Sequence, residues 1–187
     1  MTLAKRLKAM GSAKYQRDGV PPLSGPGFGV TLHPDVVDEP LRWRKPRTVF
    51  VNSMSDLFHP EIPDDFIRSV FDVMGQARQH TFQVLTKRPQ RMATLTHDRF
   101  ATPEEVDAGY ELGLVPSLWD TATSGIPASN VWLGASIESD RYCFRAGHVR
   151  ATDAAVRFLS LEPLLGPLPS LDLNDIDWVI VGAESGR

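Results

Sequence analysis

The stretch VFVNSMSDLFHPEIPDDFI, residues 49–67, places residue types that could do chemistry at the end of an apolar run. A β-branched run stops at Asn52, and small and acidic residues with His59 follow before a helical pattern begins. Asp56 and His59 stand three positions apart. This spacing suits an acid–base pair, but it also suits an aspartate that stabilises a turn before a helix. The sequence leaves both interpretations open.

Polar residues follow four further apolar runs. They are Thr86, Lys87 and Arg88; Ser136, Glu138 and Ser139; Ser160 and Glu162; and Glu184 and Ser185. In parallel α/β folds the carboxyl ends of the strands meet at one edge, where ligands bind. The glutamates together with Lys87 and Arg88 therefore predict a polar mouth suited to a zwitterionic or hydroxyl-rich ligand. The alternative is that each strand end is polar only because it emerges into water.

Six short apolar runs rich in β-branched residues are predicted to be strands. They span residues 28–32, 48–54, 81–87, 131–137, 156–162 and 178–184. Most are continuous rather than alternating, which predicts strands covered on both faces. Helical patterns span residues 3–10 and 62–77, so strands and helices are predicted to alternate. This alternation is typical of an α/β fold with a mainly parallel sheet, either closed into a barrel or open. Residues 98–129 are predicted to be an insertion over one end of the sheet, and the Pro-rich residues 163–175 an irregular connection.

The composition is that of a soluble globular protein. The chain has 187 residues, of which 42% are hydrophobic and 23% charged, and it is predicted to form a single domain over residues 1–187. No stretch approaches 18 uninterrupted apolar residues, and the basic start MTLAKRLKAMG lacks the apolar core of a signal peptide. We therefore expect a cytoplasmic protein that makes no contact with a membrane.

The net charge of -3 provides no general attraction to polyanions, so a contact with nucleic acid would need a local basic patch. Two segments could form one. Their cationic residues are Arg42, Arg44, Lys45 and Arg47, and Lys87, Arg88 and Arg91. A phosphate-contacting surface is one interpretation of residues 41–47, and a solvated helix end is the other.

The single cysteine, Cys143, excludes an intramolecular disulfide and a Cys-rich metal or iron–sulfur site built from this chain alone. Cys143 is predicted to be a packed small side chain rather than a nucleophile. The histidines lack ligand spacing, so no metal site is predicted. GAESG, residues 182–186, is not the GxGxxG fingerprint of a dinucleotide site.

Five segments in order carry a resemblance to a known family. They are TLHPDVVDEPLRWRKPRTVFVNSMSDLFHPEIPDDFI, HTFQVLTKRPQRM, NVWLGASIES, VRFLSLEPLLGP and DWVIVGAESG. Their succession resembles the phage- and prophage-associated radical S-adenosylmethionine-like proteins, which are distantly similar to spore photoproduct lyase. The resemblance covers nearly the whole chain. It implies a partial or full TIM-like (β/α) barrel with helices outside, S-adenosylmethionine as cofactor, and a [4Fe-4S] cluster held by three cysteines in a loop after the first strand.

Site residues also follow from the resemblance. It implies that Ser55 and Asp56 contact the amino group of S-adenosylmethionine. Lys87, Ser136, Glu138 and Glu162 would line the barrel beside the cofactor, and Gly182 with Glu184 would approach its adenine. Against the family pattern, the first strand, the three cysteines and the final helix and strand are missing, so the chain is expected to be truncated at both ends.

Three functions follow as hypotheses. The first is a non-catalytic chain that keeps a vestigial S-adenosylmethionine site, because reductive cleavage of this cofactor needs the cluster. The second is a binding or regulatory module whose open barrel edges pair with a second copy or another protein. The third is a nucleic-acid-binding protein that uses the two basic segments.

Overall fold

A computed structural model describes residues 3–19, 25–53, 55–96 and 129–183. They belong to two compact units, Met1–Val36 and Val37–Arg187. The first unit contains α1 (Leu3–Ala9), η1 (Ala13–Tyr15) and η2 (Pro34–Val36). The helix predicted at 3–10 is therefore confirmed, whereas the strand predicted at 28–32 is wrong.

Local hydrogen bonds explain why residues 28–32 form no strand. The N–H of Phe28 donates to Gly25 O at 3.2 Å, within a turn, and the N–H of Gly29 donates to Arg17 O at 3.0 Å. Gly27 has a φ of +81°, and a Cβ there would lie 2.8 Å from Ala4 O. Turn residues thus hold this apolar run beside the N-terminal helix, and the N–H groups of Phe28 and Gly29 are already paired.

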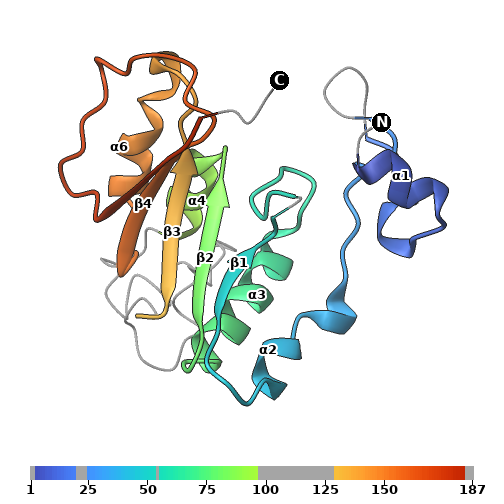
Figure 1. The fold of residues 1–187 in the computed structure, drawn as a ribbon. Helices are drawn as coiled ribbons and strands as arrows, with labels where there is room; N and C mark the ends of the chain where they lie inside the picture. The colour runs from blue at the N-terminus through green and yellow to red at the C-terminus, as the bar shows by residue number, and fades with distance from the viewer. Residues whose placement is uncertain (1–2, 20–24, 54, 97–128, 184–187) are drawn as a thin grey trace, which may run out of the picture. The chain divides into compact units, whose positions relative to one another are not determined.

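The second unit contains the sheet. Its elements are α2 (Glu39–Arg42), β1 (Thr48–Val51), α3 (Asp64–Gln76), β2 (Thr81–Thr86), α4 (Pro89–Thr96), β3 (Val131–Ser136), η3 (Asp140–Tyr142), α6 (Arg145–Arg150), β4 (Val156–Leu161) and β5 (Trp178–Val181). The strands lie side by side in chain order, and every neighbouring pair is parallel (Figure 1). The predicted parallel α/β sheet is confirmed, with five of its six expected strands. It is an open sheet and not a closed barrel, since β1 and β5 are its two edges.

Helix α3 forms where the sequence predicts a helix. Pro63 precedes it, and Asp64 and Asp65 occupy its first turn, where carboxylates interact favourably with the helix dipole. Ile67, Phe71 and Met74 recur at helical spacing and are buried. This spacing gives α3 one apolar stripe, which it buries against the sheet.

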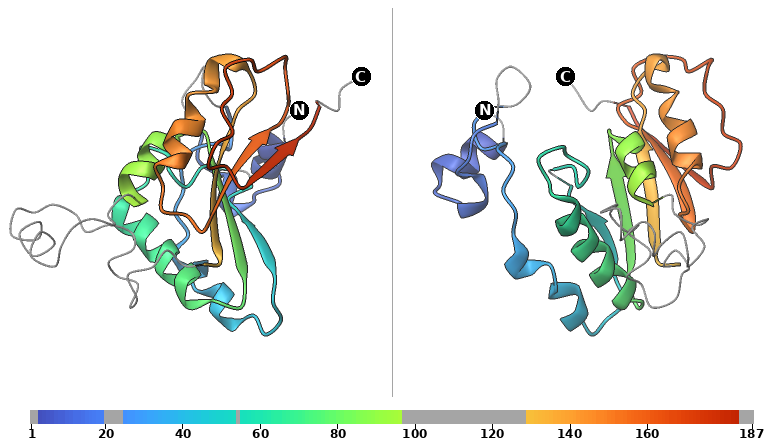
Figure 2. Two further views of the ribbon diagram at one scale, coloured as in Figure 1. Left: turned by 90° about the vertical axis from the view of Figure 1, so that its left-hand side faces the viewer. Right: turned by 180° about the vertical axis from the view of Figure 1, so that it is seen from behind.

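Helices α3, α4 and α6 lie on the same face of the sheet (Figure 2). Burial along β2 alternates accordingly, with Phe82, Val84 and Thr86 buried and the residues between them partly exposed. No helix described between residues 37 and 183 covers the other face. The expectation of strands buried on both faces nevertheless holds for β3 and β4, whereas β1, β2 and β5 are partly exposed. We call this second face, which carries Trp132 and Phe158, the open face.

Aromatic side chains pack on the open face. Trp178 lies 5.8 Å from Trp132 and 5.7 Å from Phe158, measured between ring centroids. Gly134 pairs with Phe158 across β3 and β4, and a Cβ at Gly134 would lie 2.7 Å from the Phe158 ring. The phenyl ring is fully buried because glycine leaves room for it.

The connection after β4 has no helix or strand between residues 162 and 177, as the Pro-rich sequence predicts. The expected insertion at 98–129 lies almost wholly outside the described residues. Among the helices that the structure describes, none is long and apolar enough to cross a membrane.

Candidate functional site

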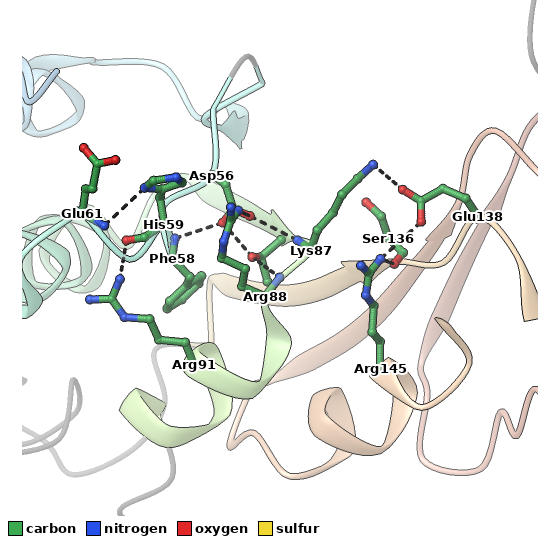
Figure 3. Close-up of polar contacts among 11 residues, drawn as sticks. Asp56, Phe58, His59, Glu61, Lys87, Arg88, Arg91, Ser136, Glu138 and Arg145 are labelled. Atoms are coloured by element: carbon green, nitrogen blue, oxygen red, sulfur yellow. Dashed lines mark hydrogen bonds and ion pairs between the residues drawn. The ribbon is translucent and has the colours of Figure 1, made fainter. Parts of the chain in front are cut away.

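The carboxylate of Asp56 joins the segment after β1 to the segment after β2 (Figure 3). Its Oδ1 accepts hydrogen bonds from Thr86 Oγ1 at 2.7 Å and from the N–H of Phe58 at 3.0 Å. Its Oδ2 accepts from Arg88 Nη1 at 2.7 Å and from the N–H of Lys87 at 3.3 Å. Four donors therefore occupy this carboxylate, which gives Asp56 a structural role.

His59 does not pair with the Asp56 carboxylate. Its Nδ1 accepts a hydrogen bond from the N–H of Glu61 at 3.2 Å, and its own N–H donates to Asp56 O at 3.0 Å. The bond from Phe58 N–H to Asp56 Oδ1 spans two residues and closes a turn. Of the two interpretations of this spacing, the structure favours the turn-stabilising aspartate.

Glu138 lies between two cations at the carboxyl ends of β2 and β3 (Figure 3). Lys87 Nζ forms an ion pair with Glu138 Oε1, and Arg145 Nη1 donates to Oε2 at 3.2 Å. Burial alone would raise the pKa of Glu138, but the hydrogen bond and charge of Lys87, together with Arg145, outweigh burial and lower this pKa below its ordinary value. Glu138 is thus an anion held by two positive charges.

Sequence reasoning missed Arg145. It lies in α6, its Nη1 also donates to Ser136 O at 2.7 Å, and it is 8% exposed. A basic residue in a helix that follows a strand is unremarkable in a sequence. Only the packing of α6 against β3 brings its guanidinium to the strand end.

Glu162 and Gly182 meet at the ends of β4 and β5. Ser160 Oγ donates to Glu162 Oε2 at 3.3 Å, and a Cβ at Gly182 would overlap the Glu162 carboxylate. Backbone bonds from Leu164 N–H to Gly182 O at 2.9 Å and from Leu165 N–H to Glu138 O at 3.0 Å tie the ends of β3 and β5 together. The predicted residues Glu138, Glu162 and Gly182 thus lie along one edge.

Other residues of the predicted mouth are placed differently. Ser136 is buried at the end of β3, and its hydroxyl makes no hydrogen bond to any described residue. Ser55 is exposed, and its N–H donates to Asn52 O at 3.0 Å in the turn after β1. Glu184 lies outside the described residues.

The two basic segments lie at opposite ends of the sheet. Arg42, Arg44, Lys45 and Arg47 precede β1, whereas Lys87, Arg88 and Arg91 follow β2. Because β1 and β2 are parallel, a strand length of roughly 20 Å separates the two groups. Arg91 also holds the segment before α3: it donates to Ile62 O at 2.7 Å and contacts His59 O and Asp64. The two segments therefore do not form one continuous patch.

The described residues contain no group of three His, Cys, Asp or Glu side chains that could hold a metal ion. The thiol of Cys143 donates to Asp140 Oδ1 at 3.4 Å, and burial followed by the negative charge of Asp140 raises its pKa. Both effects oppose the thiolate that an iron–sulfur cluster needs, and this chain has no second cysteine. Its residues therefore do not fit a [4Fe-4S] cluster.

The whole chain, residues 1–187, matches the family described as Protein of unknown function (DUF5131). The chain belongs to this family. No curated protein and no solved structure matches it. The family description carries no activity, so the function has to be argued from the site.

Proposed function

We propose that the carboxyl edge of the sheet binds a small zwitterionic molecule of the S-adenosylmethionine type, and that this chain alone carries out no radical chemistry. The observation that carries the proposal is the convergence of charges of both signs at the ends of consecutive parallel strands. Lys87, Glu138 and Glu162 follow β2, β3 and β4 in turn. Such an edge is the usual ligand site of parallel α/β folds.

The residues that remain available favour a ligand with positive groups. Within the described part of the chain, Glu162 is exposed and accepts a hydrogen bond from the Ser160 hydroxyl alone, and the Ser136 hydroxyl has no partner. Glu162 and Ser136 could receive an amino or sulfonium group, while Lys87 could exchange Glu138 for a ligand carboxylate. Asp56 is less suitable than the sequence implied, because four donors already occupy it.

The resemblance to phage-associated radical S-adenosylmethionine-like proteins agrees with this choice of ligand, and the open parallel sheet is compatible with a partial TIM-like barrel. Bound S-adenosylmethionine would supply a reactive sulfonium centre. The protein's own part would be to bind and orient it, since the single cysteine leaves the cluster without ligands from this chain.

Calorimetric titration with S-adenosylmethionine tests the proposal. We expect the wild-type protein to show a heat of binding. In Glu162→Gln the affinity should fall at least about tenfold, because the variant lacks the negative charge that would face the sulfonium. Glu61→Gln, an exposed glutamate after β1, is the matched control and should leave binding unchanged. S-adenosylhomocysteine, which lacks the sulfonium charge, should bind more weakly.

A second variant tests the position of the Glu162 carboxylate. In Gly182→Ala the added Cβ would displace this carboxylate, so we expect weaker S-adenosylmethionine binding with little loss of stability. No binding heat at millimolar ligand, or equal affinity in Glu162→Gln, would reject the proposed site. Reconstitution of a four-iron cluster on the purified chain would reject its non-radical part.

A further inference from the structure

A second concave site lies on the helix-covered side of the sheet, between the segment after β1, the start of α4 and α6. We call it the α4–α6 pocket. Its volume is about 670 Å³, which is within the range of small-molecule sites. It is lined by Phe58, Lys87, Arg88, Arg91, Phe144 and Arg145, among others. Lys87 and Arg145 also reach the carboxyl edge, whereas Phe144 and the residues of α4 do not belong to it.

Positive charge exceeds negative charge around this pocket. Among the described residues, four cations (Lys87, Arg88, Arg91 and Arg145) face three carboxylates, which belong to Asp56, Asp64 and Glu138. One positive charge is therefore left over. Figure 3 shows Arg88 at the Asp56 carboxylate, and Lys87 and Arg145 at the Glu138 carboxylate. A partly desolvated surplus cation favours an anionic ligand.

Two of the guanidinium groups retain unused donors. Arg88 donates to Asp56 through Nη1, and its side chain is 39% exposed. Arg145 donates through Nη1, whereas its Nε is buried and has no acceptor among the described residues. A buried donor without an acceptor costs free energy.

The start of α4 adds further donors. The first N–H groups of a helix have no intrahelical acceptor. Those of Gln90 and Arg91 find no acceptor elsewhere in the described chain either. They carry the positive end of the helix dipole, and phosphate oxygens bind at such ends. The Nε of Arg145, a residue that lines the same pocket, is buried and also lacks an acceptor among the described residues.

Aromatic rings form part of the remaining wall. Phe58 is fully buried, whereas Phe144 is 63% exposed at the rim. The ring of His148 lies edge-on to Phe144, with centroids 6.2 Å apart. An exposed aromatic ring beside a cationic pocket is suited to stacking a nucleobase.

We propose that the α4–α6 pocket binds a phosphomonoester of a flat aromatic compound, which is the chemistry of a mononucleotide. The phosphate would lie at the start of α4 near Arg88 and Arg145, and the aromatic part against Phe144. This site shares Lys87 with the proposed S-adenosylmethionine site, but neither proposal requires the other ligand to bind.

Thr94 allows a matched pair of test variants. It lines the pocket from the exposed side of α4, and its hydroxyl donates to Gln90 O at 3.1 Å. Thr94→Glu places a negative charge in the pocket, and Thr94→Gln is its neutral counterpart of similar size. We expect AMP affinity, measured by titration calorimetry, to fall at least about tenfold in Thr94→Glu and to change little in Thr94→Gln.

Two further comparisons identify the ligand groups. Adenosine should bind at least about tenfold more weakly than AMP, because it lacks the phosphate. Phe144→Ala should weaken AMP binding about fivefold or more through lost stacking, and this exposed position can be changed without disturbing the core. Glu162→Gln, which alters the other site, should leave AMP affinity unchanged.

Several results would contradict the proposed mononucleotide site. Equal affinity for AMP and adenosine, or an unchanged affinity in Thr94→Glu, would overturn the assignment. So would a failure of AMP, GMP, CMP and UMP to bind at millimolar concentration. If an oligothymidylate binds and these mononucleotides do not, the pocket is part of a nucleic-acid-binding surface and the mononucleotide proposal is wrong.

Discussion

Arg88 Nη1 donates to Asp56 Oδ2 at 2.7 Å, although the two residues lie 32 positions apart in the chain. This bond fastens the loop after β1 to the start of α4, and so shapes both the carboxyl edge and the α4–α6 pocket. Both proposed ligand sites thus depend on the position of this loop. The contribution of the Asp56–Arg88 bond can be tested by measuring the stability of variants.

Asp56→Ala should destabilise the protein by about 1–3 kcal/mol, because Thr86 Oγ1, Arg88 and two backbone N–H groups lose their acceptor together. Urea unfolding followed by circular dichroism measures the change. Asp65→Ala is the matched control: this exposed aspartate in the first turn of α3 should contribute less than about 1 kcal/mol. Equal losses in the two variants would contradict the role assigned to Asp56.

Gly134→Ala should cost about 1–3 kcal/mol, because its Cβ would lie 2.5 Å from Phe158 O and 2.7 Å from the Phe158 ring. Thermal unfolding compares this variant with Gly166→Ala, where a Cβ would meet no atom within 4 Å. Gly166→Ala should unfold at nearly the wild-type temperature. A Gly134→Ala protein as stable as wild type would show that β3 and β4 do not pack as described.

Asn130→Asp should destabilise the junction of α3, β2 and β3 by about 1–3 kcal/mol. Asn130 Nδ2 donates to Met74 O and His80 O, both at 2.9 Å, and to Ala77 O at 3.3 Å. A carboxylate would instead face these carbonyl oxygens with negative charge. Asn52→Asp provides the control because Asn52 is exposed and makes no side-chain hydrogen bond to a described residue. If urea midpoints fall equally in both variants, the three carbonyl bonds contribute nothing.

Glu138 should make stability depend on pH in the acid range. Its pKa is lowered from 4.5 in the folded protein, because Lys87 and Arg145 outweigh the opposing effect of burial. The stabilisation is therefore complete above the unfolded-state pKa, and it is lost as the pH falls through the lowered folded-state pKa. Glu138→Gln should remove this contribution, so that stability declines less steeply below about pH 5.

A series of urea unfolding curves across the acid range measures this dependence. Glu61→Gln serves as control, since this exposed glutamate should leave the wild-type slope intact. Parallel stability curves for wild type and Glu138→Gln would show that the cations do not stabilise the Glu138 carboxylate.

The sequence alone was enough to predict most of the elements. Runs of β-branched residues predict β1 to β5, and the stripe of Ile67, Phe71 and Met74 after two acidic residues predicts α3, because these patterns reflect local geometry and one-sided burial. The run at 28–32 has the same composition and forms no strand. The N–H groups of Phe28 and Gly29 are taken by a neighbouring turn and by Arg17 O, and composition does not report that competition.

The coverage of the sheet was predicted less well. Continuous apolar runs predict strands buried on both faces, and this holds for β3 and β4. No described helix covers the open face, where aromatic rings such as Trp132 and Trp178 pack on one another instead. Large apolar side chains that cover each other produce the same run as side chains covered by helices. The sequence therefore could not distinguish the two arrangements.

The candidate site, too, could be predicted from the sequence only in part. Polar residues at strand ends could be found from the sequence, and parallel strands do bring Lys87, Glu138 and Glu162 to one edge. The partners of these residues could not be found from the sequence, since Arg145 reaches Glu138 from α6. Nor could the separation of the two basic segments to opposite ends of the sheet. Local chain patterns determine where a strand ends, but contacts between distant residues depend on strand order, helix packing and competition for donors, which exist only once the chain has folded.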